Sequence, residues 1–229
     1  MTHVSIREVC LRDGLQIEDP IPLAAKVELL EAVVATGVRE VEATAFVSPS
    51  KVPALADAEA LAIELKRFRD SHDVEFSALV ASPNGAKRAL AAGLTSIEYV
   101  VSASDSHSRA NVGRDTAAAT AAIAEVQRIA QDGGARVEVI IATAWDCPFD
   151  GPTPAHRTLE VARTAAELGV DRIAIADTIG TATPGRVRSL VDAVRPVIGE
   201  LPLGAHFHNT RGAGLASAYA AVLAGVTRL

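Results

Sequence analysis

The stretch Glu167-Leu168-Gly169-Val170 ends a helical pattern with a glycine turn and leads into a short β-branched strand. Glycine adopts the left-handed conformation after a helix at little cost, so the turn marks a helix end. The same arrangement occurs three more times, at Ala35-Thr36-Gly37-Val38, Ala91-Ala92-Gly93-Leu94 and Leu223-Ala224-Gly225-Val226. This repeat of helix, turn and strand predicts an α/β fold.

Seven strands are expected from the β-branched runs between the helical patterns. They cover residues 4–9, 39–43, 74–80, 96–101, 136–143, 172–176 and 203–207. Alternation with helices implies parallel strands with right-handed crossovers, which leaves an eight-stranded barrel or a doubly wound sheet. The first strand is not followed by a Gly-x-Gly-x-x-Gly motif, and polar residues close nearly every strand. The sequence therefore favours a TIM (β/α)8-type barrel.

Residues 225–229 have the form of a turn that enters a further strand. Barrels of this kind have about 250 residues, and this chain has 229. We therefore expect one catalytic barrel domain, residues 1–229, that is incomplete at its C-terminus because strand eight and its helix are missing. The sequence shows no linker or low-complexity tract that would indicate a second domain.

Charge and cysteine content argue against several functional classes. A net charge of −6, without any run of Lys or Arg, speaks against a nucleic-acid partner or an anionic membrane surface. Cys10 and Cys147 are too few for a disulfide framework, and the N-terminal residues lack the pattern of a signal peptide. We expect a cytoplasmic protein with no nucleic-acid or membrane partner.

His206 and His208 are two residues apart on the last expected strand, so their imidazoles point to the same face. Two neutral imidazoles directed at one point make half of a metal site. Asp13 would meet them in a closed barrel, where strands one, eight and seven are neighbours. Singly, His206 suits a core histidine and His208 a loop histidine, whereas with Asp13 they predict ligands for a divalent cation.

Glu42 and Asp177 follow apolar strands that a barrel would bury. A buried carboxylate is costly unless it is paired, and Arg12 is the obvious cation for both. The pairing would serve catalysis or would only fix geometry. A perturbed pKa does not distinguish the two roles, because ion-pair networks also perturb pKa values. Arg12-Asp13 taken alone would suit a surface turn with a local ion pair.

Three other features give weaker signals. Cys147 precedes a proline in a loop, which favours an inert thiol over a nucleophile. Gly212-Ala213-Gly214 could receive a phosphate, yet it suits an ordinary helix start better. His107 is a candidate for the mouth of the barrel.

Five motifs stand out when the chain is taken as a whole. They are Arg12-Asp13-Gly14-Leu15-Gln16, the run VEATAFVSP at residues 41–49, Cys147-Pro148-Phe149-Asp150-Gly151, Asp177-Thr178-Ile179-Gly180 and His206-Phe207-His208. Jointly they resemble the 3-hydroxy-3-methylglutaryl-CoA lyase group of the barrel metallolyases, the DRE-TIM superfamily. The related Claisen synthases usually have Glu where this chain has Leu15, which favours the lyase branch.

The resemblance implies a metal-assisted retro-Claisen cleavage of an acyl-CoA substrate, as in leucine degradation and ketone-body formation. 3-Hydroxy-3-methylglutaryl-CoA would give acetyl-CoA and a keto acid such as acetoacetate. The resemblance implies these roles: metal ligands Asp13, His206 and His208 for Mg²⁺ or Mn²⁺; catalytic residues Arg12, Glu42 and Asp177; substrate-binding residues Arg12, Gln16 and Thr178. Arg12 would stabilise the enolate oxygen, and the two carboxylates would orient Arg12, metal-bound water or the proton that is removed.

The sequence also departs from the family pattern. The family has an Asn metal ligand and a mobile Cys-bearing loop after the seventh strand, so we expect a truncated enzyme that lacks part of its catalytic apparatus. Cys10-Leu11, Ile17-Glu18-Asp19 and Asn209 replace the usual family residues, which leaves a related 3-hydroxyacyl-CoA open as substrate. Alternatives are an aldolase or Claisen-type acyltransferase of the same superfamily, or a non-catalytic binding remnant. Exposed edges of a seven-stranded barrel suggest a homodimer.

Overall fold

A computed structural model describes residues 3–229 of the chain, which divide into two compact units. The first unit contains Ser5–Tyr99 and Arg128–Val137. The second unit contains Val100–Gln127 and Glu138–Leu229, together with the residues up to Val4. Strands β4 (Ser96–Ser102) and β5 (Arg136–Ala142) contribute residues to both units.

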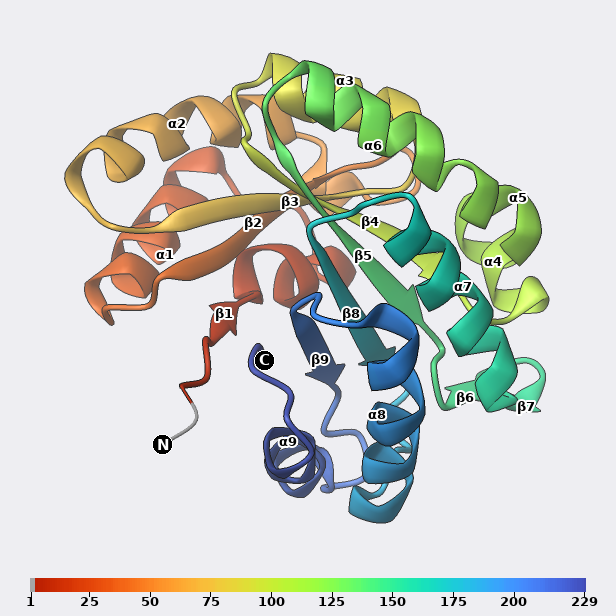
Figure 1. The fold of residues 1–229 in the computed structure, drawn as a ribbon. Helices are drawn as coiled ribbons and strands as arrows, with labels where there is room; N and C mark the ends of the chain where they lie inside the picture. The colour runs from red at the N-terminus through yellow and green to blue at the C-terminus, as the bar shows by residue number, and fades with distance from the viewer. Residues whose placement is uncertain (1–2) are drawn as a thin grey trace. The chain divides into compact units, whose positions relative to one another are not determined.

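The first unit is built on parallel strands. β1 (Arg7–Glu8) pairs with β2 (Glu40–Phe46), β2 pairs with β3 (Glu75–Val80), and β3 pairs with the start of β4. The helices of this unit are α1 (Leu23–Ala35), α2 (Ala58–Ser71) and α3 (Pro83–Ala91), with short helical turns at Cys10–Gly14, Leu15–Ile17 and Pro53–Leu55. In Figure 1, α1 and α2 lie along one face of β2 and β3.

The second unit continues the parallel order from β5 to β8 (Arg172–Asp177) and then β9 (Leu203–Phe207). Its helices are α4 (Asp105–Val112), α5 (Thr116–Ala121), α7 (Ala155–Glu167), α8 (Pro184–Ile198) and α9 (Gly214–Leu223), while α6 (Ile123–Asp132) has residues in both units. A small antiparallel pair, β6 (Asp146–Cys147) with β7 (Gly151–Pro152), was not expected from the sequence.

The expected glycine turns end helices as predicted. Gly37, Gly93, Gly169 and Gly225 have φ angles of 83°, 91°, 72° and 94°, which an L side chain would adopt only with strain. Each turn sends the chain back toward the sheet, where most residues of β2, β3, β4, β5 and β8 are buried. All residues of β8 except Arg172, for example, are buried, as is typical of a parallel sheet covered by helices.

The strand order β1-β2-β3-β4-β5-β8-β9 is the sequential order of a TIM-type barrel. It confirms the predicted α/β class and the seven parallel strands within residues 3–229. Arg228 forms an isolated parallel bridge with Gly204 of β9, where the sequence predicted the start of a further strand. The backbone N–H of Ala205 donates to the Arg228 carbonyl at 3.0 Å.

Two strand predictions need correction. The first strand was expected over residues 4–9, but β1 covers only Arg7–Glu8, and a helical turn begins at Cys10. β2 was expected to end at residue 43 but continues to Phe46 through a register shift between Glu42 and Thr44. Glu42 therefore lies within a strand and not at its end, because the bulge takes up one extra residue.

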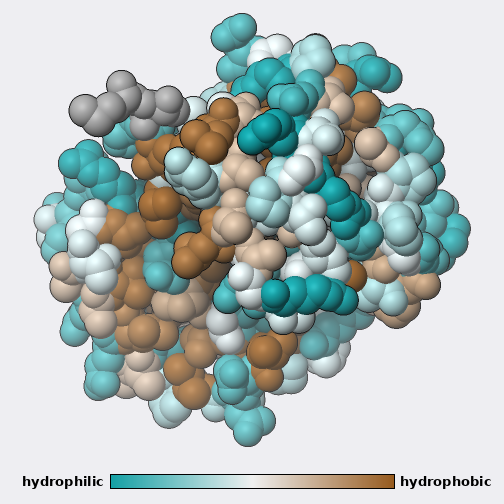
Figure 2. All heavy atoms as spheres, turned by 90° about the horizontal axis from the view of Figure 1, so that it is seen from below, coloured by the Kyte–Doolittle hydropathy of each residue, from teal (hydrophilic) through white to brown (hydrophobic). Residues whose placement is uncertain are grey.

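Helix α9 carries an exposed apolar face. Leu215, Tyr219 and Leu223, spaced four residues apart, are 87%, 66% and 62% exposed. Figure 2, which views the molecule from below the orientation of Figure 1, shows apolar side chains gathered among polar ones on that face. Across the part of the chain that is described, no helix combines the length and the apolar character needed to cross a membrane.

Candidate functional site

Arg12 lies in a tight helical turn directly after β1. The backbone N–H groups of Arg12, Asp13 and Gly14 all donate to the carbonyl of Val9, at 3.1, 2.7 and 3.3 Å. This turn directs the Arg12 guanidinium toward β2, where Nε donates to Glu42 Oε1 at 2.7 Å and Nη2 donates to Oε2 at 2.8 Å. The predicted pairing of Arg12 with Glu42 is thus a two-bond ion pair between buried side chains.

The electrostatics of this pair favour a permanent charge on Arg12. Burial disfavours the cation, but the charge and hydrogen bonds of Glu42, with a smaller contribution from Asp13, raise the pKa of Arg12 above its ordinary value. A guanidinium held in this way is a fixed positive charge, suited to stabilising an oxyanion without reorganisation.

Asp13 and Gln16 extend the same cluster. Asp13 Oδ1 accepts hydrogen bonds from Arg12 Nη1 at 2.6 Å and from Gln16 Nε2 at 2.8 Å. Gln16 Oε1 in turn accepts a longer hydrogen bond from Arg12 Nη1 at 3.4 Å. The two donors fix the orientation of the Asp13 carboxylate, as a ligand with a supporting hydrogen-bond shell requires.

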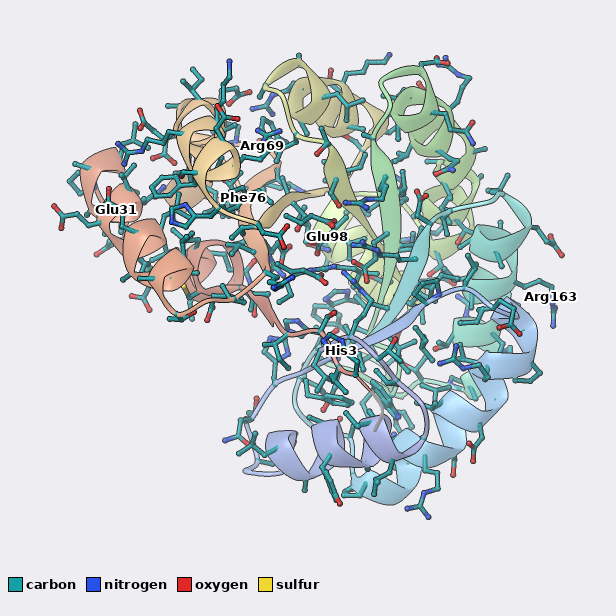
Figure 3. All side chains as sticks on the ribbon, turned by 60° about the vertical axis from the view of Figure 1, so that its left-hand side comes forward. His3, Glu31, Arg69, Phe76, Glu98 and Arg163 are labelled. Atoms are coloured by element: carbon teal, nitrogen blue, oxygen red, sulfur yellow. The ribbon has the colours of Figure 1, made fainter. Side chains whose placement is uncertain are left out.

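Glu98, in the middle of β4, is a buried carboxyl that the sequence reasoning missed. Arg7 Nη1 lies 2.9 Å from Glu98 Oε1, and the Ser77 hydroxyl donates to the same oxygen. Burial and the nearby charge of Glu42 raise the pKa of Glu98 to about 7, against the opposing effect of Arg7. In Figure 3, Glu98 lies at the strands, whereas Glu31 and Arg69 lie on helices. A Glu inside an apolar strand was the available signal, whereas Glu42 was identified as a polar residue at the end of one.

The second unit holds Asp177 at the end of β8 by backbone donors. Asp177 Oδ1 accepts from the N–H of Thr181 at 2.9 Å, and Oδ2 accepts from the N–H of Ala182 at 3.0 Å. The sequence had suggested Arg12 as the cation for Asp177. Within this unit, the loop that follows the strand turns back so that its amide groups donate to both carboxylate oxygens, and the pairing with Arg12 stays a prediction.

Thr178 follows Asp177 and accepts a hydrogen bond at 2.7 Å from the backbone N–H of Thr143. Thr143 lies directly after β5, is fully buried and has a φ angle of 55°. A β-branched residue in the left-handed region is strained, and such strain is often found at functional sites. Thr143 was expected as the last residue of its strand, and this conformation is the reason the strand ends at Ala142.

His206 and His208 lie as the spacing predicted, with their imidazoles side by side. Their Nε2 atoms are 3.5 Å apart. His208 Nδ1 lies 2.9 Å from the backbone carbonyl of Asp177, so Nδ1 carries the hydrogen and Nε2 presents a lone pair. Two ligand nitrogens at right angles on one divalent ion would be about 3 Å apart. The pair therefore fits shared coordination of a cation, with the tautomer of His208 fixed by a carbonyl.

The structure thus groups the predicted site residues into two sets. The first unit brings together Arg12, Asp13, Gln16 and Glu42. The second unit brings together the backbone of Asp177 with His208, and His208 with His206. Thr178 joins the second set through Thr143.

Comparison with known proteins places these residues in a family context. The HMGL-like family model matches residues 3–229. An (R)-citramalyl-CoA lyase from Chloroflexus aurantiacus is 36% identical over 99% of this chain and 74% of its own length. A hydroxymethylglutaryl-CoA lyase from Pseudomonas mevalonii is 33% identical over 99% of this chain and 74% of its own length.

Solved structures also match this chain over nearly its whole length. An HMG-CoA lyase from Acinetobacter baumannii, in complex with coenzyme A and 3-methylmalate, superposes with a TM-score of 0.92 at 33% identity, covering 99% of this chain and 73% of that one. The carboxyl transferase domain of Rhizobium etli pyruvate carboxylase has a TM-score of 0.74 at 16% identity, covering 99% of this chain and 39% of that one, which shows a shared fold alone.

Proposed function

Because the chain belongs to the HMGL-like family, we propose that it is a lyase that cleaves a 3-hydroxy-3-methylacyl-CoA to acetyl-CoA and a keto acid. Two related substrates follow from the relatives: (R)-citramalyl-CoA, which would give pyruvate, and 3-hydroxy-3-methylglutaryl-CoA, which would give acetoacetate. The two acyl groups differ by one methylene between the tertiary alcohol and the free carboxylate. Both are CoA thioesters, the substrate class that the relatives share.

The observation that carries the proposal is the paired Nε2 atoms of His206 and His208, with His208 Nδ1 on the Asp177 carbonyl. We infer that these nitrogens and the Asp13 carboxylate hold a divalent cation, Mg²⁺ or Mn²⁺. Two His and one carboxylate leave coordination positions for substrate oxygens. When bound, the cation would lower the pKa of the substrate hydroxyl and polarise the carbonyl that forms.

The remaining steps of the cleavage are assigned to residues of the chain itself. In the cleavage the 3-hydroxyl loses its proton, the C2–C3 bond breaks, and the electron pair moves onto the thioester as an enolate that is then protonated. Arg12 would stabilise the enolate oxygen, a charge that develops only during the reaction. Glu42 would orient Arg12 through their two hydrogen bonds. Asp13 is oriented in turn by Gln16.

Asp177 acts on the site through its backbone in this proposal. Both carboxylate oxygens accept amide hydrogen bonds from the loop that follows β8. Its carbonyl orients His208, so Asp177 is a positioning residue by this geometry. Thr178 would bind substrate beside it.

The test is a product assay with both thioesters. The purified chain is incubated with each substrate and Mg²⁺ or Mn²⁺, and acetyl-CoA, pyruvate and acetoacetate are quantified by chromatography. We expect acetyl-CoA in equal amount to one keto acid, loss of turnover with a chelator, and recovery when metal is returned. Formation of a thioester adduct from acetyl-CoA and a 2-keto acid, without cleavage activity, would instead indicate a Claisen-type acyltransferase.

Binding without any turnover would indicate a non-catalytic protein. The matched variants are His208→Ala and His156→Ala, since His156 is exposed on α7 outside the proposed site. A single catalytic domain, self-association as a homodimer and a cytoplasmic location stay predictions, which limited proteolysis, sedimentation and cell fractionation test.

A further inference from the structure

The end of β4 carries a Ser–His pair that the proposed chemistry does not use. Ser102 is the last residue of β4 and is buried, and its Oγ lies 2.7 Å from His107 Nδ1. The Ser102 carbonyl accepts a hydrogen bond from Thr116 Oγ1 at 2.9 Å, which fixes the end of the strand. Burial lowers the pKa of His107, which favours the uncharged form of the imidazole. The hydrogen bond from Ser102 therefore holds this imidazole in one orientation.

The loop between β6 and β7 is bound to the first turn of α4, next to this histidine. Asp150 accepts hydrogen bonds from the hydroxyls of Ser104 and Ser106, both at 2.8 Å. Ser104 is also the N-cap of α4, where its Oγ accepts from the N–H of His107. These bonds hold the motif Cys147-Pro148-Phe149-Asp150-Gly151, which the sequence singled out, against the helix that carries His107.

This arrangement places an exposed aromatic ring beside the imidazole. The rings of Phe149 and His107 have centroids 6.3 Å apart, and Phe149 is 61% exposed. Phe149 lies in a loop that two hydrogen bonds to Asp150 hold against α4, and an apolar ring beside one polar group is typical of ligand sites.

The strand ends of the second unit place this pair at the same edge as the predicted site residues. The N–H of Ala103 donates to the carbonyl of Ala142 at 2.9 Å, and the N–H of Ala144 donates to the carbonyl of Ala176 at 3.1 Å. β4, β5 and β8 therefore end side by side. Ligands of parallel α/β sheets bind outside these carboxyl ends.

We propose that His107 binds the acyl group of the substrate and sets the acyl preference of the enzyme, with Ser102 as its positioning residue and Phe149 as the apolar wall. The proposal rests on the proposed function and names the residues that distinguish its two candidate substrates. In this proposal the Ser102 hydroxyl is the donor to Nδ1, so Nε2 would keep its hydrogen and donate to the free carboxylate of the acyl group. One methylene moves that carboxylate relative to the thioester, so the hydrogen bond forms well with only one of the two substrates.

The test compares His107→Phe, His107→Gln and Ser102→Ala with the wild type and with His156→Ala. Phe keeps the ring and removes the N–H, whereas Gln restores a donor. Steady-state rates are measured with both thioesters, and binding is followed by the fluorescence of Trp145, the single tryptophan of the chain. Trp145 packs near Phe207 of β9, with ring centroids 5.6 Å apart.

We expect His107→Phe to raise KM for the preferred thioester about 10-fold or more, the loss expected for a hydrogen bond to a charged group. The kcat should change much less, and the ratio of kcat/KM between the two thioesters should move toward one. Gln should recover part of the preference, Ser102→Ala should lose part of it, and His156→Ala should leave it unchanged.

An unchanged ratio in all three variants, with wild-type cleavage intact, would overturn the role of His107 and leave the proposed function standing. A wild-type chain that neither cleaves nor binds either thioester would overturn the proposed function, and the role of His107 with it. Circular dichroism of each variant separates loss of folding from loss of binding. If His107→Phe fails to fold, His107→Gln serves as the test, and it should weaken the preference between the two thioesters without abolishing it.

Discussion

Glu42 holds Arg12 by two nearly parallel hydrogen bonds, Oε1 to Nε at 2.7 Å and Oε2 to Nη2 at 2.8 Å. Both side chains are buried, at 1% and 7% exposure. Removing the Glu42 charge leaves the buried Arg12 guanidinium with Asp13 as its remaining carboxylate partner, and Asp13 is the more exposed of the two. Glu42→Gln should therefore lower the free energy of unfolding by about 3–5 kcal/mol, measured by urea denaturation.

The first unit offers a matched control for this change. Arg39 and Asp73 also form an ion pair, at 2.9 Å, but their side chains are 78% and 89% exposed. Asp73→Asn should cost less than about 1 kcal/mol because solvent screens an exposed pair. Equal effects of the two variants would show that burial of the Arg12–Glu42 pair adds nothing to stability.

Metal binding can be measured without turnover. His208→Ala and Asp13→Ala should each weaken Mn²⁺ binding at least about 10-fold, because each removes one of three proposed protein ligands. Electron paramagnetic resonance reports free Mn²⁺ directly, and His156→Ala should bind as the wild type does. Affinity that survives both ligand variants would rule out the proposed metal site.

Much of the fold could be predicted because the signals are local. A glycine turn such as Gly169 and a β-branched run such as residues 172–176 are decided by neighbours in the chain, and both are present as predicted. The spacing of His206 and His208 is local as well. Their shared face follows from strand geometry alone.

The contacts between strands could not be predicted in the same way. The partners of Glu98 come from β1 and β3, so they depend on strand register. A bulge such as the one after Glu42 shifts that register by one residue and leaves no clear mark in the sequence. The short β1 has a different and local origin, because the N–H groups of residues 12–14 donate to the Val9 carbonyl and start a helical turn there.

Glu98 should make stability depend on pH. Its pKa is raised from 4.5 to about 7 in the folded protein, first by burial and then by Glu42. Between these values the folded state holds a proton that the unfolded chain has lost, so the contribution of Glu98 to stability decreases as pH rises through this window. Above pH 7 the destabilisation that comes from charging the buried Glu98 carboxylate is complete, and below pH 4.5 it is absent.

Glu98→Gln removes this titration. The free energy of unfolding of the variant, minus that of the wild type, should increase from pH 5 to pH 7 and then level off. Glu28→Gln, an exposed change on α1, should give a nearly constant difference. A flat difference for Glu98→Gln across the same range would show that Glu98 keeps the same charge throughout.

Gly180 should control the position of His208. Its φ angle is 67°, and a Cβ atom there would lie 2.8 Å from the His208 carbonyl and 2.6 Å from Thr210 Oγ1. Thr210 Oγ1 can rotate away, but Thr210 Cβ, also 2.8 Å from the added atom, and the His208 carbonyl can move only with the backbone. Gly180→Ala should therefore weaken Mn²⁺ binding. It should also destabilise the protein by more than the left-handed φ angle alone, which costs about 1–2 kcal/mol.

Gly113→Ala separates these two effects. Gly113 has a similar φ angle of 76°, yet a Cβ atom there would meet nothing within 4 Å. This variant should lose only the about 1–2 kcal/mol that the left-handed φ angle costs and keep the wild-type affinity for Mn²⁺. If Gly180→Ala also kept full affinity, the imidazole of His208 would be positioned by Asp177 alone, and the loop from Gly180 would have only a structural role.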